Sequence, residues 1–282
     1  MPTASPSSRR RRRRRRDWAG LPLDVILAVL GKLDHVDVLV GAGQVCRSWR
    51  RAARDEPTLY HRIDIHGDLV DPYRDDETEF YDDLNLAEVA RAAVRRAAGQ
   101  CEAFWGEFPG DDSFLHFLAE QAPSLKSLRL HSCDDASSQG FAEAIRKLPL
   151  LEDLELSLCS NLFGKELFQT VGHSCPRLKH FARWHFHSDR RHIKYRDEEA
   201  AGIATMTELR SLKIHGNLLT TNGLVTILDS CPNLESLDID GCNINMDDVL
   251  REKCANIKML MLPEDNLSRN LKFLKSRRQK PE

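Results

Sequence analysis

The stretch APSLKSLRLHSCDDASSQGFAEAIRKLPLLEDLELSLC, residues 122–159, contains the pattern L-x-x-L-x-L twice, with first leucines 26 residues apart. The end of each copy alternates leucine with polar residues, which is typical of a short β-strand with one buried face. Between the copies, Phe141, Ile145 and Leu148 recur at intervals of four and three residues, which predicts an amphipathic helix. The stretch therefore predicts one strand and one helix per repeat.

The same pattern recurs through the second half of the chain. The first apolar positions of six copies are spaced by 26, 27, 31, 25 and 23 residues. This pattern, at a period of about 20–29 residues, is typical of leucine-rich repeats, whose stacked strand–helix units form a curved α/β solenoid. The copies are Leu125-Leu128-Leu130, Leu151-Leu154-Leu156, Leu178-Phe181 with Arg183 at the third apolar position, Leu209-Leu212-Ile214, Leu234-Leu237-Ile239 and Ile257-Leu260-Leu262.

Two segments before these copies extend the array. Residues 84–99 predict a helix and residues 101–108 a strand, together a divergent first repeat. Residues 60–65 alternate Ile63 and Ile65 with polar residues and predict an opening, capping strand. We therefore expect a right-handed solenoid of about six to seven repeats.

Six of the eight cysteines fall at two positions of the repeat. The sequence has no C-x-x-C pair and no secretory signal, so neither a zinc site nor a disulfide framework is indicated. We expect buried structural thiols that satisfy backbone groups. The first position holds Cys133, Cys159 and Cys242, with Asn217 as the equivalent residue, and the second holds Cys175, Cys231 and Cys254.

Residues 18–60 predict three short helices. Pro22 suits the first turn of one helix, followed by Ile26, Val29, Leu30 and Leu33 at helical spacing. Residues 37–40 begin a second helix, and Val45, Trp49 and Ala52 define a third. About 40 residues form a marginal core, so this module needs a partner or a neighbouring domain.

The motifs W-x-x-L-P, I-L-x-x-L, D-V-L, V-C-R-x-W-R and L-Y follow one another over residues 18–60 and resemble an F-box. With the cysteine-containing repeats, residues 18–265 resemble the plant-type F-box/LRR-repeat proteins. The resemblance implies a non-catalytic substrate receptor of an SCF ubiquitin ligase, whose F-box binds a Skp-type adaptor and, through it, a cullin and a RING subunit. It also implies that the adaptor-facing residues, or those supporting that face, are Trp18, Leu21, Pro22, Ile26, Leu27, Val45 and Trp49.

A protein substrate would bind the outward strand positions of the repeats. The charges there alternate in sign, and two tryptophans could act as anchors. The irregular unit at 176–206 is the best local candidate for contact because of its extra aromatic and basic residues. The candidate substrate-binding residues are Trp105, Arg129, Glu155, His180, Trp184, Lys213 and Asp238.

The chain carries no catalytic signature such as G-x-S-x-G, a Walker A loop or H-E-x-x-H, and we expect no metal and no cofactor. No apolar run approaches the 18 residues that cross a membrane, so we expect a protein of the nucleus or cytoplasm. We divide the chain into a disordered Arg-rich leader (1–17), the F-box (18–62), a strand with an acidic linker (63–83), the repeats (84–265) and a basic tail (266–282).

The arginine run, Arg9 to Arg16, favours a different function from that of a ubiquitin-ligase receptor. Eight adjacent arginines would bind phosphates, as in a nuclear nucleic-acid-binding protein, or act as a nuclear-import signal. However, the rest of the chain has a net charge of −10, which would repel a polyanion. A third hypothesis is an F-box scaffold that acts outside any ligase.

Overall fold

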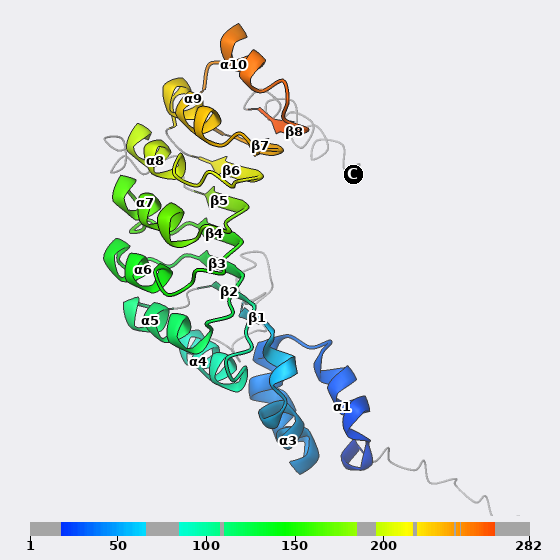
Figure 1. Ribbon diagram of the computed structural model, residues 1–282. Helices are drawn as coiled ribbons and strands as arrows, with labels where there is room; N and C mark the ends of the chain where they lie inside the picture. The colour runs from blue at the N-terminus through cyan, green and yellow to red at the C-terminus, as the bar shows by residue number, and fades with distance from the viewer. Residues whose placement is uncertain are drawn as a thin grey trace, which may run out of the picture.

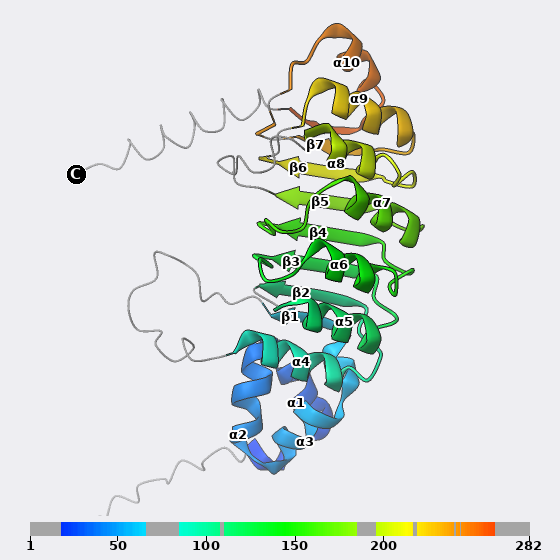
Figure 2. The same ribbon diagram turned by 90° about the vertical axis from the view of Figure 1, so that its left-hand side faces the viewer.

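The computed structural model describes residues 18–65, 85–107, 110–184, 196–216, 219–239, 241–242 and 244–262. Within these ranges a small helical module is followed by a sheet of eight parallel strands, stacked in chain order from β1 to β8 (Figure 1). The helices of the repeats lie along one side of this sheet, and the module sits at its β1 end (Figure 2). The predicted leader, the acidic segment 66–84 and the tail lie outside the described residues.

The N-terminal module, residues 18–60, contains the three predicted helical regions, with two differences in their bounds. The first helix ends at Leu30, so Leu33 lies beyond it. Val45 ends the second region rather than beginning the third, because Cys46 is extended (φ −167°, ψ 178°) and breaks the helix. The elements are η1 Trp18–Gly20, α1 Leu23–Leu30, η2 Asp37–Ala42, α2 Gly43–Val45, α3 Arg47–Asp55 and η3 Pro57–Tyr60.

Each copy of the repeat pattern forms a strand, as the sequence predicts. The strands pair in register, so the apolar side chains at equivalent positions form a continuous buried ladder: Ile63, Phe104, Leu128, Leu154, Phe181, Leu212 and Leu237. The strands are β1 Arg62–Ile65, β2 Ala103–Glu107, β3 Ser127–His131, β4 Asp153–Ser157, β5 His180–Trp184, β6 Ser211–His215, β7 Ser236–Asp238 and β8 Met259–Met261.

A helix follows each strand from β1 to β7, and most helices begin at a capping side chain. Asn85, Asp111, Ser137, Thr220 and Asp247 each accept a hydrogen bond from the backbone N–H three residues further on, which satisfies a donor left open at a helix start. The helices are α4 Leu86–Arg96, α5 Asp112–Gln121, α6 Ser138–Ile145, α7 Lys165–Ser174, α8 Arg196–Ile203, α9 Thr221–Ser230 and α10 Asp248–Lys253.

The first repeat differs from the prediction. Residues 84–108 were expected to form it as a helix followed by a strand, but α4 is the helix that follows β1 in the solenoid. The capping strand β1 is therefore the strand of a first strand–helix unit, and the segment 66–84 connects its two halves. The long separation between β1 and α4 hid this unit from a search for a regular period.

The cysteines are free thiols, and the repeat positions are buried as predicted. Each of several thiols donates to a carbonyl of the preceding repeat: Cys175 Sγ lies 3.6 Å from Leu148 O, and Cys242 Sγ lies 3.2 Å from Ile214 O. Burial raises the pKa of Cys175 to about 12. These thiols therefore link neighbouring repeats as neutral hydrogen-bond donors.

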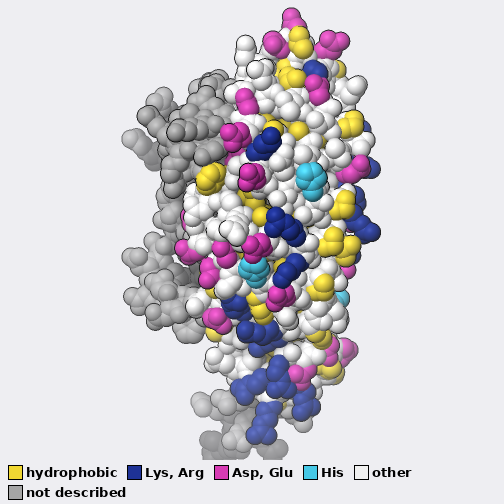
Figure 3. All heavy atoms as spheres, turned by 60° about the vertical axis from the view of Figure 1, so that its left-hand side comes forward, with side chains coloured by type: hydrophobic (Ala, Val, Ile, Leu, Met, Phe, Trp, Pro, Cys, Tyr) yellow, Lys and Arg dark blue, Asp and Glu magenta, His cyan; other side chains and the backbone are white. Residues whose placement is uncertain are grey.

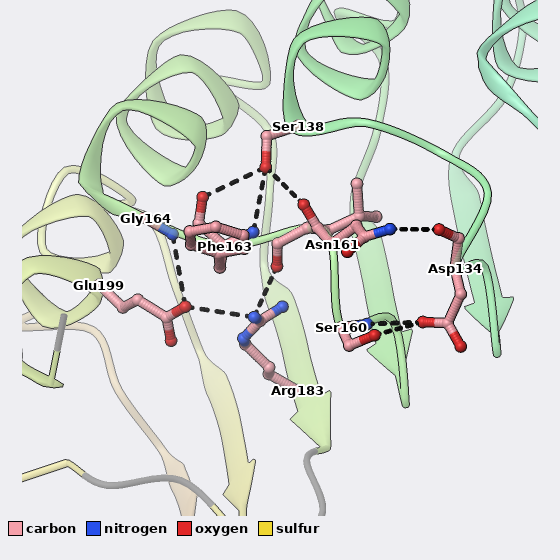
Figure 4. Close-up of polar contacts among 9 residues, drawn as sticks. Asp134, Ser138, Ser160, Asn161, Phe163, Gly164, Arg183 and Glu199 are labelled. Carbon is pink, nitrogen blue, oxygen red and sulfur yellow. Dashed lines mark hydrogen bonds and ion pairs between the residues drawn. The ribbon is translucent and has the colours of Figure 1, made fainter. Parts of the chain in front are cut away.

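Strand β5 breaks the apolar ladder with a charged residue. Arg183 occupies an inward position and is fully buried, between Leu156 and Ile214 on the adjacent strands. One guanidinium nitrogen donates to Leu162 O at 2.6 Å and lies 3.2 Å from Glu199 Oε1 (Figure 4). Arg183 thus joins the β4–α7 loop, β5 and α8, the elements around the irregular repeat.

Candidate protein-binding sites

The N-terminal module exposes more large apolar side chains than its size accounts for. Nine such side chains are exposed among the described residues, and five of them lie between residues 18 and 45: Trp18, Leu23, Val25, Leu33 and Val45. Leu23 and Val25 are exposed because they lie in α1, where seven of the eight residues, LDVILAVL, are apolar and only one side of the helix can face the core. An apolar surface of this kind marks a protein-binding site.

The predicted adaptor-facing residues divide into exposed and buried groups. Trp18 and Val45 are each 50% exposed, Pro22 is exposed, and Leu21 and Leu27 are half-buried. Ile26 and Trp49 are buried in the core of the module, so they support the surface rather than form it. The sequence analysis did not name Leu23 and Val25 as adaptor-facing residues. A signal was present, because Asp24 is the one charged residue of α1, so apolar side chains lie on both sides of this helix.

Trp49 fixes the position of Trp18. The Trp49 Nε1–H donates to Trp18 O at 3.0 Å, and the two rings meet edge to face with centroids 6.3 Å apart. Ser48 Oγ donates to Ala19 O at 3.2 Å. The turn η1 is therefore held against α3, and the exposed Trp18 ring is pre-organised for contact with a partner.

The module is joined rigidly to the solenoid. Tyr60 is fully buried; its hydroxyl donates to Ala53 O at 2.5 Å and accepts from Arg96 on α4 at 3.1 Å. Burial raises the pKa of Tyr60, so the phenol stays neutral. His35 makes a second link: its Nδ1 accepts from the Asp64 N–H of β1 at 3.2 Å, and its Nε2 donates to Leu59 O at 3.1 Å. These contacts fix the distance and angle between the two parts.

Charge is distributed unevenly between the two parts. Helix α3 exposes Arg47, Arg50, Arg51 and Arg54. Figure 3 shows Lys and Arg gathered at the end of the molecule that the module forms, whereas charges of both signs are mixed over the repeats. The module therefore combines an exposed apolar surface with a concentration of positive charge.

The predicted substrate-binding residues share one face of the sheet. Five of them form a row across the strands, Trp105–Arg129–Glu155, then Ala182, then Lys213–Asp238, while His180 and Trp184 flank Ala182 on β5. The alternating charges largely compensate one another, because Arg129 lies 2.9 Å from Asp153 and 3.7 Å from Glu155. The hydrogen bond to Asp153 raises the pKa of Arg129.

Asp238 was predicted to present an outward, accessible side chain, but this side chain is not accessible. It is buried, and its Oδ2 lies 3.1 Å from His215 Nε2. His215 in turn stacks on Trp184, with ring centroids 4.4 Å apart and planes 6° apart. Asp238 therefore acts on this face by holding His215 beneath Trp184, and Trp184 remains 45% exposed.

Residues 185–195, the aromatic and basic part of the unit favoured for substrate contact, lie outside the described residues. Within the described part of the chain, no helix is long and apolar enough to cross a membrane. In the same part, no group of three or more His, Cys, Asp or Glu side chains is placed to hold a metal ion.

Comparison with known proteins decides the family. The F-box-like family model matches residues 18–66, which include the helical module and β1. F-box protein SKIP19 of Arabidopsis thaliana is 36% identical over 270 residues, covering 94% of this chain and 83% of the relative. This chain belongs to the F-box/LRR-repeat family.

Two further F-box/LRR-repeat relatives from Arabidopsis thaliana agree. Putative F-box/LRR-repeat protein 22 is 36% identical over 89% of this chain and 78% of its own length. Putative F-box/LRR-repeat protein 23 is also 36% identical over 89% of this chain, which spans 54% of that longer relative. The N-terminal module is thus the F-box, and the solenoid is its leucine-rich-repeat domain.

Proposed function

We propose that this chain is the substrate-recognition subunit of an SCF-type ubiquitin ligase. Its F-box binds a Skp-type adaptor, which connects it to a cullin and a RING subunit, and the outward face of its strands binds a protein substrate. The observation that carries the proposal is the exposed apolar surface of the F-box, formed by Trp18, Leu23, Val25, Leu33 and Val45. Family membership supports the same role.

Such a receptor needs no catalytic group of its own. Ubiquitin transfer is accelerated when a substrate lysine is held near a charged conjugating enzyme, so the receptor contributes proximity. Proximity requires a fixed spacing between the adaptor-binding and substrate-binding surfaces. The contacts of Tyr60 with Arg96 and of His35 with Asp64 supply that stiffness between F-box and solenoid. We place the protein in the nucleus or cytoplasm, where ubiquitin ligases act.

Co-purification with a Skp-type adaptor tests the proposal. The wild-type chain is expected to bind the adaptor, and Leu21→Ala/Pro22→Ala to bind it less well, since Leu21 is half-buried and Pro22 exposed at the start of α1. Deleting residues 1–16 should leave adaptor binding intact. Failure of the wild type to bind would refute the adaptor role.

A second step separates a ligase subunit from a scaffold. Cell extract is added to the purified chain–adaptor complex, and recovery of a cullin is measured. Recovery supports the ligase. A complex that holds the adaptor but recovers no cullin would favour the scaffold.

A further inference from the structure

The last repeat is the least covered part of the solenoid core. Leu212 and Leu237 of the apolar ladder are fully buried, whereas the equivalent residue of β8, Leu260, is only partly buried. Ile257 and Leu262, the other apolar residues of that copy of the repeat pattern, are partly buried as well and pack against the core. We call Ile257, Leu260 and Leu262 the β8 end. The apolar core therefore reaches the surface at the β8 end.

The two ends of the described solenoid differ. At β1 the F-box covers the core, and Tyr60 is fully buried between the two parts. At the opposite end, no described strand pairs with the outer edge of β8, and no described helix follows it (Figure 1). A repeat array with an open apolar end needs a terminal cap, and an open strand edge pairs readily with another chain. The β8 end therefore needs an occupant.

The order of elements indicates what that occupant is. Each described strand from β1 to β7 is followed by a helix, and these helices lie along one side of the sheet (Figure 2). The chain continues after β8 with residues 263–282, which lie outside the described residues. Asp265 stands four residues after the end of β8, as Asp111, the N-cap of α5, stands four residues after the end of β2. The sequence thus has a helix start signal where the repeat requires one.

The residues that follow carry the apolar spacing of a repeat helix. Leu267, Leu271 and Leu274 are separated by four and three residues. The fully buried apolar residues of α6 and its C-terminal end have the same spacing: Phe141, Ile145 and Leu148. At 3.6 residues per turn, the three leucines share one side of a helix, and Arg269 and Lys272 fall on the other side. Such a helix could bury its leucines and leave its charges in water.

We propose that residues 266–276 form the helix that follows β8 and caps the solenoid. Its three leucines pack on the β8 end, and its basic side chains face solvent. The contact is intramolecular and does not depend on the proposed ligase function. It closes the solenoid at the end opposite the F-box, so both ends of the core are covered by parts of the same chain.

Hydrogen exchange of the full-length chain, followed by mass spectrometry, tests the cap. Residues 248–262, which hold α10 and β8, are expected to exchange at least about tenfold faster in Leu271→Asp than in the wild type, because a carboxylate is costly to bury against the β8 end. Residues 127–157, which contain β3 and β4, are expected to exchange equally in both proteins, which shows that the variant is folded. Equal exchange of residues 248–262 in the two proteins would overturn the proposal.

The matched control is Lys272→Asp. It introduces the same side chain one residue later, on the side expected to face solvent, and it changes the net charge more than Leu271→Asp does. Its exchange is expected to equal that of the wild type. If Lys272→Asp accelerated exchange as much as Leu271→Asp does, the added charge rather than lost packing would be the cause, and the proposal would fail.

A second copy of the chain is the other occupant that an open strand edge can take. Sedimentation velocity is expected to show a wild-type monomer, and the protection of residues 248–262 is expected to stay the same on dilution. A dimer that dissociates on dilution, with loss of that protection, would assign the β8 end to a second copy and overturn the proposal.

Discussion

The F-box and the leucine-rich repeats meet the same requirement, burial of apolar side chains, in different ways. Each repeat adds a leucine or phenylalanine to a ladder that its neighbours cover, and Leu128, Leu154 and Leu212 are almost fully buried. The F-box consists of short helices, and among the described residues it leaves Trp18 and Val45 half exposed. The difference indicates that the repeats complete one another, whereas the F-box is completed by another protein.

The largest loss of stability is expected within the repeats at Arg183, the charged residue that stands where the other repeats have an apolar one. Arg183→Leu removes the guanidinium that lies 3.2 Å from the buried Glu199 carboxylate, so the free energy of unfolding should fall by about 3–5 kcal/mol in urea denaturation. Arg183→Leu/Glu199→Leu restores an apolar ladder and should recover most of that loss. Equal stability of the single and double variants would show that the ion pair is not energetically coupled.

Replacing one leucine in each part by alanine compares the buried ladder of the repeats with the exposed surface of the F-box. Leu154→Ala empties a fully buried position of the ladder and should cost about 2–5 kcal/mol of unfolding free energy. Leu23→Ala, at an exposed position of α1, should change stability by no more than about 0.5 kcal/mol. If Leu23→Ala destabilised the chain as much as Leu154→Ala does, its side chain would belong to the core rather than to a binding surface.

The junction between the two parts should show an intermediate effect. Tyr60→Phe removes a hydroxyl that donates to Ala53 O and accepts from Arg96, and both partners are left near the buried ring. We expect a loss of about 1–3 kcal/mol and earlier release of the F-box by limited proteolysis. Unchanged proteolysis of Tyr60→Phe would show that this link does not hold the two parts together.

The buried thiols are expected to have the smallest effect on stability near neutral pH. Burial raises the pKa of Cys159 and Cys231 from 9.0 to about 11, so these thiols are neutral in both folded and unfolded chains at pH 7. Above pH 9 the unfolded chain loses these protons first, so stability should decline between about pH 9 and pH 11. Replacing both residues by Ala should lessen that decline, to which the other buried thiols such as Cys175 also contribute, and an unchanged slope would assign it to other groups.

Much of this architecture follows from local sequence. The L-x-x-L-x-L pattern placed the strands, because alternation and period are determined by short-range geometry. The cysteine positions followed from the same period. The motifs of residues 18–60 similarly placed the helical module, although Cys46 and Leu33 show that breaks and helix ends were less accurate.

The remaining features depend on residues that meet only in the fold. The partner of Arg183 is Glu199, across a long irregular connection, and no period predicts it. Asp238 is on the expected face but is buried by its contact with His215.

The affinity of the full chain for a purified Skp-type adaptor tests the central claim most directly. Val45→Asp places a charge in the exposed apolar surface of the F-box, and Val249→Asp does the same at an exposed position of α10 in the last repeats. Isothermal titration calorimetry should show at least about tenfold weaker binding for Val45→Asp, because a charge is then desolvated in an apolar interface. Val249→Asp should bind as the wild type does. Equal affinity of all three proteins, or a loss of affinity in Val249→Asp alone, would contradict the claim that the exposed surface of the F-box is the adaptor-binding site.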